Sequence, residues 1–247
     1  KKIFKRDVSG ALLKDQDGQV CGVEATDSLT GQTRHLRAKV VINATGVFVD
    51  SILHLDNPSS PKLIAPSQGI HLVLDKSFSP GDKAIMVPHT DDGRVIFLVP
   101  WHGRVLVGTT DIGLDAPVAE PRPLDEEIDF LLEHASRYLT RDPKRVDILS
   151  VFAGIRPLIK ADGEDKTSSL SRDHHLTISQ SGLVTIAGGK WTTYRKMGED
   201  AVTQAARFAG LPPRSCKTEN LPLHGWINGL DPRDHLSVYG SDIEEIR

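Results

Sequence analysis

Apolar and polar positions along the first third of the chain predict short antiparallel strands. Residues 8–13, 19–26 and 33–43 are rich in Val, Leu, Ile and Thr, and polar turns separate them. The third segment ends in an apolar run, residues 40–42 (VVI), followed by a turn of small residues (NATG). Continuous apolar strands usually lie in the middle of a sheet that is covered on both faces. The pattern therefore predicts a three-stranded meander whose last strand enters a covered sheet.

The rest of the chain is predicted to combine more strands with two long helices. A Pro- and Ser-rich stretch at residues 57–67 is the first expected domain boundary. Apolar residues recur at helical spacing over residues 124–139 and 192–209, and acidic residues load the start of the first helix. Another helix is expected to begin near Gly229. Further strands are expected at residues 69–74, 84–88, 94–100, 104–110, 146–159, 175–180 and 183–187.

Composition narrows the class of protein. The chain has 247 residues, with 30 Lys and Arg against 33 Asp and Glu, and this balance argues against a nucleic-acid binder. The longest apolar runs are only strand-sized, and no signal peptide is recognisable. The two cysteines, Cys21 and Cys216, have no metal-binding or redox spacing, so we expect a reduced cytoplasmic protein without a metal site. The abrupt start and end of the chain suggest a piece of a larger protein.

The strongest candidate for a binding site is residues 187–195 (AGGKWTTYR). An apolar strand runs into two glycines, which let a ligand approach the backbone closely. Thr192 or Thr193 can cap the following helix, whose free N–H groups favour negative charge, and Lys190 adds a full positive charge. The alternative is an ordinary turn between a strand and a helix.

A second candidate is Arg156, within residues 151–159 (VFAGIRPLI). A guanidinium in such an apolar strand is expensive to bury without a partner, so either an internal carboxylate or a ligand anion should satisfy it. Arg172, in residues 171–173 (SRD), could supply a second guanidinium, although a solvated loop charge is the simpler interpretation. Residues 41–46 (VINATG) and 108–111 (GTTD) are weaker signals, strand ends with small residues where a cofactor could pass close to the backbone. Among ten histidines, only His71 starts an apolar strand (SQGIHLV) and is a candidate general base.

Together these segments resemble the FAD-dependent, quinone-linked glycerol-3-phosphate dehydrogenases. The resemblance covers nearly the whole chain in order, including residues 154–158 (GIRPL), and residues 188–195 (GGKWTTYR) are its most specific part. The family usually has Pro-Trp where this chain has Val47-Phe48. The Gly-rich FAD pyrophosphate motif and most of the C-terminal cap have no counterpart, so the chain resembles a fragment that is expected to be inactive in isolation.

The resemblance implies an α+β architecture, with a largely antiparallel substrate domain attached to part of a Rossmann-like FAD-binding domain. The expected divisions are residues 1–60 (FAD domain), 61–160 (substrate domain), 161–215 (return to the FAD domain) and 216–247 (start of the cap). The implied cofactor is FAD, bound by Ala44, Thr45, Gly46, Asp50, Gly188, Gly189, Lys190, Trp191, Thr192 and Thr193.

The implied reaction is oxidation of sn-glycerol 3-phosphate to dihydroxyacetone phosphate, with electrons passed to a quinone. Arg156 and Arg172 would clamp the phosphate, His71 would act as the base, and Lys190 would contact substrate and stabilise charge on the reduced flavin. A peripheral location on the inner face of the membrane is implied, and a homodimer is left open. An oxygen-using glycerol-3-phosphate oxidase and a non-catalytic recognition fragment remain alternatives.

Overall fold

The computed structural model describes residues 8–27, 29–91, 93–160, 173–231 and 233–247. Its contacts divide the chain into two units, Lys1–Leu211 and Pro212–Arg247. The finer division of the first unit at residues 60 and 160 remains a prediction. No helix in the described ranges is long and apolar enough to cross a bilayer.

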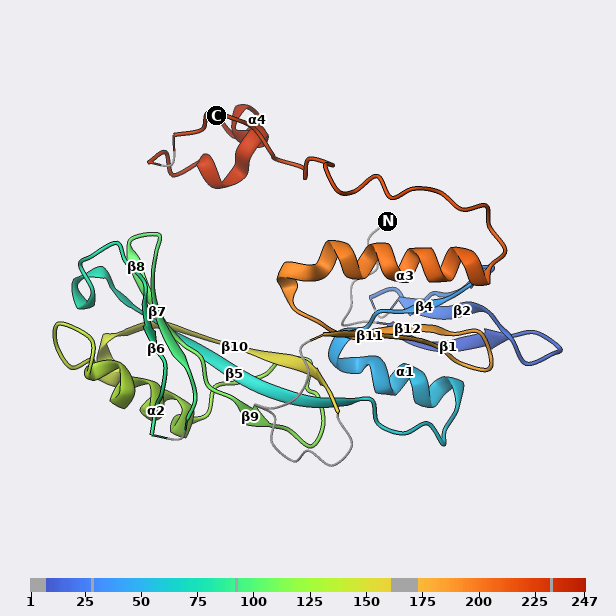
Figure 1. Cartoon of the computed structure of the whole chain (residues 1–247), viewed down its shortest axis with the longest axis horizontal. Coiled ribbons are helices and arrows are strands. Elements are labelled where there is room, and N and C mark those ends of the chain that lie inside the picture. Colours follow the sequence, from blue (N-terminus) through green and yellow to red (C-terminus); the bar gives the residue numbers. More distant parts are fainter. Residues whose placement is uncertain (1–7, 28, 92, 161–172, 232) are drawn as a thin grey trace. The chain divides into compact units, whose positions relative to one another are not determined.

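The described residues of the first unit form three sheets (Figure 1). The N-terminal meander is antiparallel, with strands β1 (Val8–Lys14), β2 (Val20–Asp27) and β3 (Thr33–Arg37). The smallest sheet contains β11 (His174–Ile178), β12 (Val184–Gly188) and β4 (Ile42–Asn43). The largest has the order β10-β5-β8-β7-β6, with β9 paired to β5; its strands are β5 (Ile64–Asp75), β6 (Ile85–Val87), β7 (Ile96–Trp101), β8 (Arg104–Gly108), β9 (Ile112–Gly113) and β10 (Ile148–Ile159).

Helix α2 (Asp125–Ser136) covers one face of the largest sheet (Figure 1). Leu131, Leu132 and Ala135 of this helix pack into the main core. Their partners are alternate residues of the strands, including Ile70, Leu72, Leu74, Leu98, Val105 and Val107. Because successive side chains of a strand point to opposite faces, His71 lies on the face away from α2.

The smallest sheet lies between α1 (Val49–Asp56) and α3 (Tyr194–Phe208) (Figure 1). Strand β12 pairs antiparallel with β11 and parallel with β4. Short 3-10 helices precede α1, β10 and α3 and follow β5: η1 (Gly46–Phe48), η3 (Arg145–Asp147), η5 (Trp191–Thr193) and η2 (Lys76–Phe78). The second unit contains η6 (Ser237–Asp242) and α4 (Ile243–Ile246), and Ser241 N donates to Gly225 O there.

The structure confirms the α+β class and the two long helices, and it corrects several local predictions. The strand expected over residues 33–43 is two strands, β3 and β4, in different sheets. The expected boundary at residues 57–67 is too long, because β5 already begins at Ile64. Helix α1 was not predicted, and the helix expected from Gly229 begins only at Ser237 as a 3-10 turn.

Candidate active site

Strands β5, β8 and β10 bring His71 and Arg156 to one side of the largest sheet. His71 lies opposite Phe152 of β10, and Ser67 lies opposite Arg156. The pair between these two rows is Gly69 and Gly154, so no side chain stands between them. Residues four apart on a strand share a face, which places His71, Phe152 and Arg156 on the same surface.

The His71 imidazole is held between two neighbours. Its ring stacks on Phe152, with centroids 5.1 Å apart and an interplanar angle of 10°. On β8 it lies against Gly108, where a β-carbon would collide with the ring. Burial, and to a smaller extent the charge of Arg156, hold the pKa of His71 below its usual 6.5. The ring is therefore neutral at pH 7 and able to accept a proton.

The Arg156 guanidinium lies over Gly69 and contacts the segment after β8. A β-carbon at Gly69 would stand 2.5–2.6 Å from both terminal guanidinium nitrogens. Nη2 of Arg156 donates to Thr109 Oγ1 at 2.9 Å, and Nη1 lies 3.8 Å from Asp111 Oδ1. The Asp111 carboxylate also accepts a short hydrogen bond from Ser67. The sequence left open an internal carboxylate or a ligand anion as the partner of Arg156, and the structure provides a carboxylate at long range while leaving the side chain 34% exposed.

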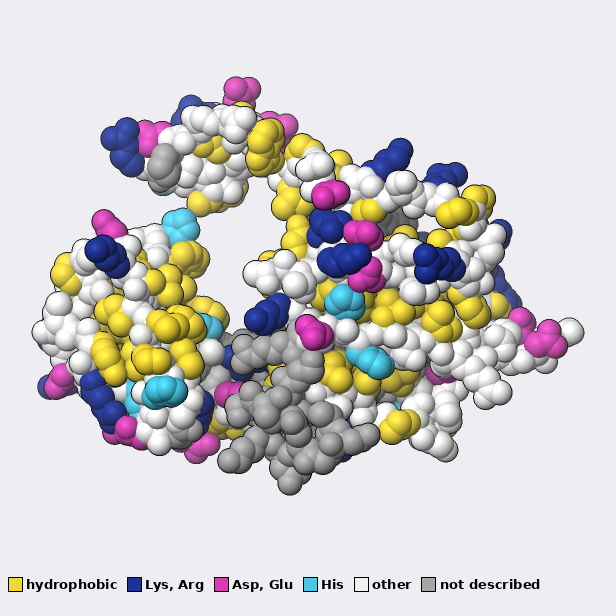
Figure 2. Space-filling model, viewed as in Figure 1, with side chains coloured by type: hydrophobic (Ala, Val, Ile, Leu, Met, Phe, Trp, Pro, Cys, Tyr) yellow, Lys and Arg dark blue, Asp and Glu magenta, His cyan; other side chains and the backbone are white. Residues whose placement is uncertain are grey.

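The row of residues that crosses the sheet through His71 is otherwise apolar, and it is open at its outer ends. Register places Met86, Phe97, Gly108, His71 and Phe152 in one row across five strands. The two outer side chains of this row, Met86 and Phe152, are 60% and 47% exposed. Figure 2 shows apolar side chains gathered over the part of the molecule where Figure 1 labels β6, β7 and β8.

The turn after β12 contains two consecutive glycines with positive φ angles. Gly188 and Gly189 have φ angles of 72° and 75°, which L side chains rarely adopt. A β-carbon on Gly188 would come 2.7 Å from Ile159 of β10, and one on Gly189 would come 2.5 Å from Met197 of α3. Both glycines are therefore required for the close packing of this turn.

Lys190 and the two threonines after the turn adopt a different arrangement from the expected helix cap. Residues 191–193 form η5, and α3 begins only at Tyr194. Thr193 stands at the N-cap position of α3, but its hydroxyl donates to Lys190 O at 2.9 Å instead of capping the helix. Lys190 and Thr192 are exposed, and Trp191 is 86% exposed and stacks on Tyr194.

The turn after β4 is tied together by its own side chains. Thr45 Oγ1 donates to Asn43 Oδ1 at 2.8 Å, and Asn43 Nδ2 donates to Val49 O at 3.0 Å. Gly46 has a φ of 62°, and Ala44 is exposed. The Asp50 carboxylate accepts from the backbone N–H groups of residues 63 and 64, at 2.9 and 3.4 Å. In this structure Asp50 joins α1 to the start of β5.

Strand β10 connects the turn after β4, the glycine turn after β12 and the surface that carries His71 and Arg156. Thr45 lines a cavity of about 920 Å³ together with Gly154 and Ile155 of β10. Ile159 of β10 packs against the Gly188 turn, and Phe152 of β10 stacks on His71. The sequence did not identify Phe152 as part of the site, although its place four residues before Arg156 was a usable signal. Arg172 lies outside the described residues.

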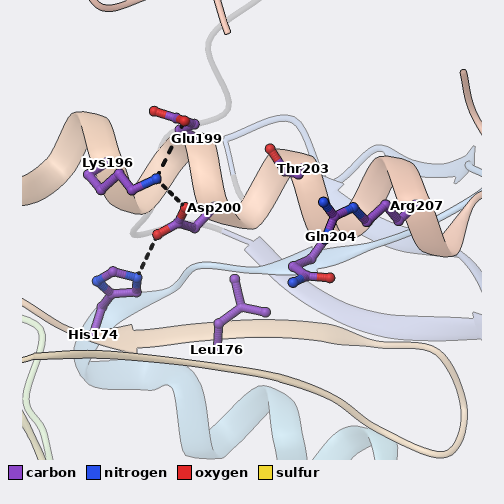
Figure 3. Close-up of a pocket in the computed structure, with 8 residues that line it drawn as sticks. All are labelled: His174, Leu176, Lys196, Glu199, Asp200, Thr203, Gln204 and Arg207. Atoms are coloured by element: carbon purple, nitrogen blue, oxygen red, sulfur yellow. Dashed lines mark hydrogen bonds and ion pairs between the residues drawn. The ribbon is translucent and has the colours of Figure 1, made fainter. Parts of the chain in front are cut away.

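A second pocket, of about 450 Å³, lies between β11 and α3 (Figure 3). Asp200 Oδ1 lies 2.8 Å from Lys196 Nζ, and Asp200 Oδ2 lies 3.1 Å from His174 Nε2. The hydrogen bond from Lys196 lowers the pKa of Asp200. Since these charges neutralise one another, this pocket is a weaker candidate site than the His71–Arg156 surface.

One parallel pair of strands, β4 and β12, accompanies a large antiparallel sheet, and both strands end in turns that contain glycine. The FAD dependent oxidoreductase family profile matches residues 2–195, and the chain belongs to that family. Mitochondrial glycerol-3-phosphate dehydrogenase from Homo sapiens is 42% identical over 222 residues, and a probable mitochondrial enzyme of that name from Caenorhabditis elegans is 40% identical over 240.

These alignments cover 87% and 94% of the chain but only 30% and 33% of the relatives, so the chain spans about a third of their length. Among solved structures, the glycerol-3-phosphate dehydrogenase from Bacillus halodurans complexed with FAD superposes with a TM-score of 0.82 at 32% identity. That superposition covers 97% of this chain and 50% of the Bacillus chain. The resemblance to the FAD-dependent glycerol-3-phosphate dehydrogenases is confirmed, including the cofactor FAD, and the quinone acceptor stays a prediction.

Proposed function

We propose that the intact protein oxidises sn-glycerol 3-phosphate to dihydroxyacetone phosphate and passes the electrons to a quinone. The observation that carries this proposal is the placement of one guanidinium, Arg156, and one neutral imidazole, His71, on the same open sheet face with two glycines between them. A three-carbon phosphate ester needs an anion clamp and a base a few ångströms apart. The names of the relatives support the same substrate.

The residues of this chain fit FAD best beside Thr45, where the cavity is large and mostly apolar and a β-carbon at Gly46 would stand in open space. Ile159 and Met197 fill the space beside Gly188 and Gly189, so a cofactor contact of that turn rests on the resemblance. We infer that Ala44, Thr45, Gly46 and the turn from Gly188 to Thr193 contact the cofactor, and that Lys190 places positive charge beside it. When bound, FAD supplies the two-electron acceptor. Asp50 acts indirectly, by holding α1 and β5 together.

In the proposed mechanism Arg156 binds the substrate phosphate by charge-assisted hydrogen bonds, and Thr109 keeps the guanidinium over Gly69. His71 accepts the proton of the C2 hydroxyl, and its lowered pKa keeps it in the accepting form near neutral pH. Phe152 fixes the plane of the ring by stacking. Arg172 is proposed as a second phosphate ligand on the resemblance alone.

The proposal is tested by titrating the 247-residue chain with sn-glycerol 3-phosphate while following the ring signals of His71 by NMR. Saturable shifts with glycerol 3-phosphate, and none with glycerol at the same concentration, are the expected result. Absence of shifts at millimolar substrate would overturn the assignment of the site to this sheet face.

The electron acceptor is identified separately in the intact protein, by comparing the rate of turnover with a soluble quinone analogue and the rate with oxygen. Faster turnover with oxygen, accompanied by hydrogen peroxide, would favour the oxidase alternative. Peripheral membrane attachment and a homodimer also stay predictions, and the curated relatives are named as mitochondrial proteins.

A further inference from the structure

Glu127 is a buried carboxylate on the first turn of α2, on the side of the sheet away from His71. It is only 1% exposed, although a charged group at such a position is expensive to bury unless hydrogen bonds satisfy it. Capping of α2 explains one of its contacts, because Leu124 N donates to Glu127 Oε2 at 3.0 Å. Two further donors reach the same carboxylate from the sheet, and capping does not require them.

The two further donors come from the strand and the segment that hold the proposed site. Thr110 Oγ1 donates to Glu127 Oε1 at 2.6 Å, and Gln68 Nε2 donates to Glu127 Oε2 at 2.7 Å. Thr110 Oγ1 in turn accepts from Ile70 N at 2.9 Å. One carboxylate therefore fastens the segment after β8 to the middle of β5.

Each of these partners is the direct neighbour of a residue on the open face. Thr110 stands between Thr109 and Asp111, and both of these residues contact the Arg156 guanidinium. Ile70 precedes His71 along β5, and Gln68 follows Ser67, which donates to Asp111. A shift of the Thr109–Asp111 segment would move these two contacts with Arg156 at once.

We propose that Glu127 is a positioning residue for the anion site, acting through Thr110 to fix Thr109 and Asp111 and so the guanidinium of Arg156. This inference rests on the proposed function, in which Arg156 binds the phosphate of the substrate. A residue on the face of the sheet that α2 covers would thus influence binding on the opposite face, where His71 and Arg156 lie.

The test uses a matched pair at Thr110 in the 247-residue chain. Thr110→Val keeps the shape of the side chain but removes the hydroxyl, whereas Thr110→Ser keeps the hydroxyl. Glu127→Gln removes the charge, and Asp129→Asn is the control on the same helix, because Asp129 pairs only with Arg145 among the contacts described. The measurements are the Kd for sn-glycerol 3-phosphate, the pKa of His71 by NMR and the Tm.

Thr110→Val and Glu127→Gln are expected to weaken substrate binding by about 10-fold or more, the effect of impairing one charge-assisted hydrogen bond. The pKa of His71 should rise part of the way toward 6.5, because the guanidinium moves away, and by no more than in an added Arg156→Gln variant, which removes that charge altogether. Thr110→Ser should stay within about 2-fold of the parent Kd, as a hydroxyl that keeps both hydrogen bonds leaves the segment in place. Asp129→Asn should change neither the Kd nor the pKa.

A lower Tm in Thr110→Val and Glu127→Gln with unchanged Kd and unchanged His71 pKa would overturn the inference and leave Glu127 as a helix cap. If the parent chain does not bind sn-glycerol 3-phosphate, the proposed function fails for this chain. The His71 pKa then still decides the positioning role, because it reports the place of Arg156 without any ligand. If Glu127→Gln does not fold, the two Thr110 variants carry the test.

Discussion

Removing the Arg156 side chain is the most direct challenge to the proposed site. Arg156→Ala deletes the guanidinium over Gly69 and leaves the Asp111 carboxylate with the hydrogen bond from Ser67. A charge-assisted hydrogen bond contributes about 1.5–3 kcal/mol. The expected loss for sn-glycerol 3-phosphate is therefore about 10- to 150-fold, in the Kd of the chain and in kcat/KM of the intact protein.

The structural cost of the same substitution should be small. The bond to Thr109 has a neutral acceptor, and Asp111 stands at 3.8 Å with both side chains partly exposed. We expect a loss of about 1 kcal/mol in the free energy of unfolding, equivalent to about 2–4 °C in Tm.

Two substrates and one further variant complete the experiment. Oxidation of plain glycerol, which carries no phosphate, should hardly change in Arg156→Ala. Arg156→Lys should recover only part of the loss, because an ammonium keeps the charge without the planar fork. Equal losses for both substrates, together with a Tm lowered by far more than expected, would show that Arg156 holds the sheet together and that the phosphate binds elsewhere.

Three further predictions follow from the same geometry. The folded-state pKa of His71 lies below its unfolded value of 6.5, so the folded chain resists protonation of this ring and loses stability as the pH falls below 6.5. In urea denaturation between pH 7.5 and 5, His71→Phe should therefore lose less free energy of unfolding than the parent chain. An equal loss would contradict the lowered pKa. Gly69→Ala should displace the guanidinium of Arg156 and weaken sn-glycerol 3-phosphate binding by about 10-fold. Gly198→Ala, in open space on α3, is the control and should leave binding unchanged while stabilising the helix by about 1 kcal/mol. Unchanged binding in both variants would refute the close approach at Gly69. Lys190→Met in the intact protein should lower the flavin midpoint potential and slow reduction by about 10²–10³-fold while affecting substrate affinity less, and an unchanged potential would leave Lys190 with a structural role.

Several parts of the molecule could be predicted from the sequence because their causes are local. The helical spacing of apolar residues predicted α2 and α3 to within a few residues at their ends. The double glycine at residues 188–189 predicted a turn where the backbone is closely approached, and both glycines have positive φ angles and close neighbours in the structure. Arg156 in an apolar strand indicated a nearby anionic partner, and Asp111 is present.

Tertiary structure decided what depends on residues far apart in the chain. The run before Asn43 joins a different sheet from β3 because β4 pairs with β12, which lies about 140 residues further along, and no local pattern specifies that partner. Thr109 reaches Arg156 across 47 residues, and Gln68 reaches Glu127 across 59. The sequence alone does not show whether the carboxylate at residue 127 is solvated or buried. Only the packing of α2 against the sheet, which removes water from this position, turns Glu127 into the acceptor that joins α2, β5 and the segment beside Arg156.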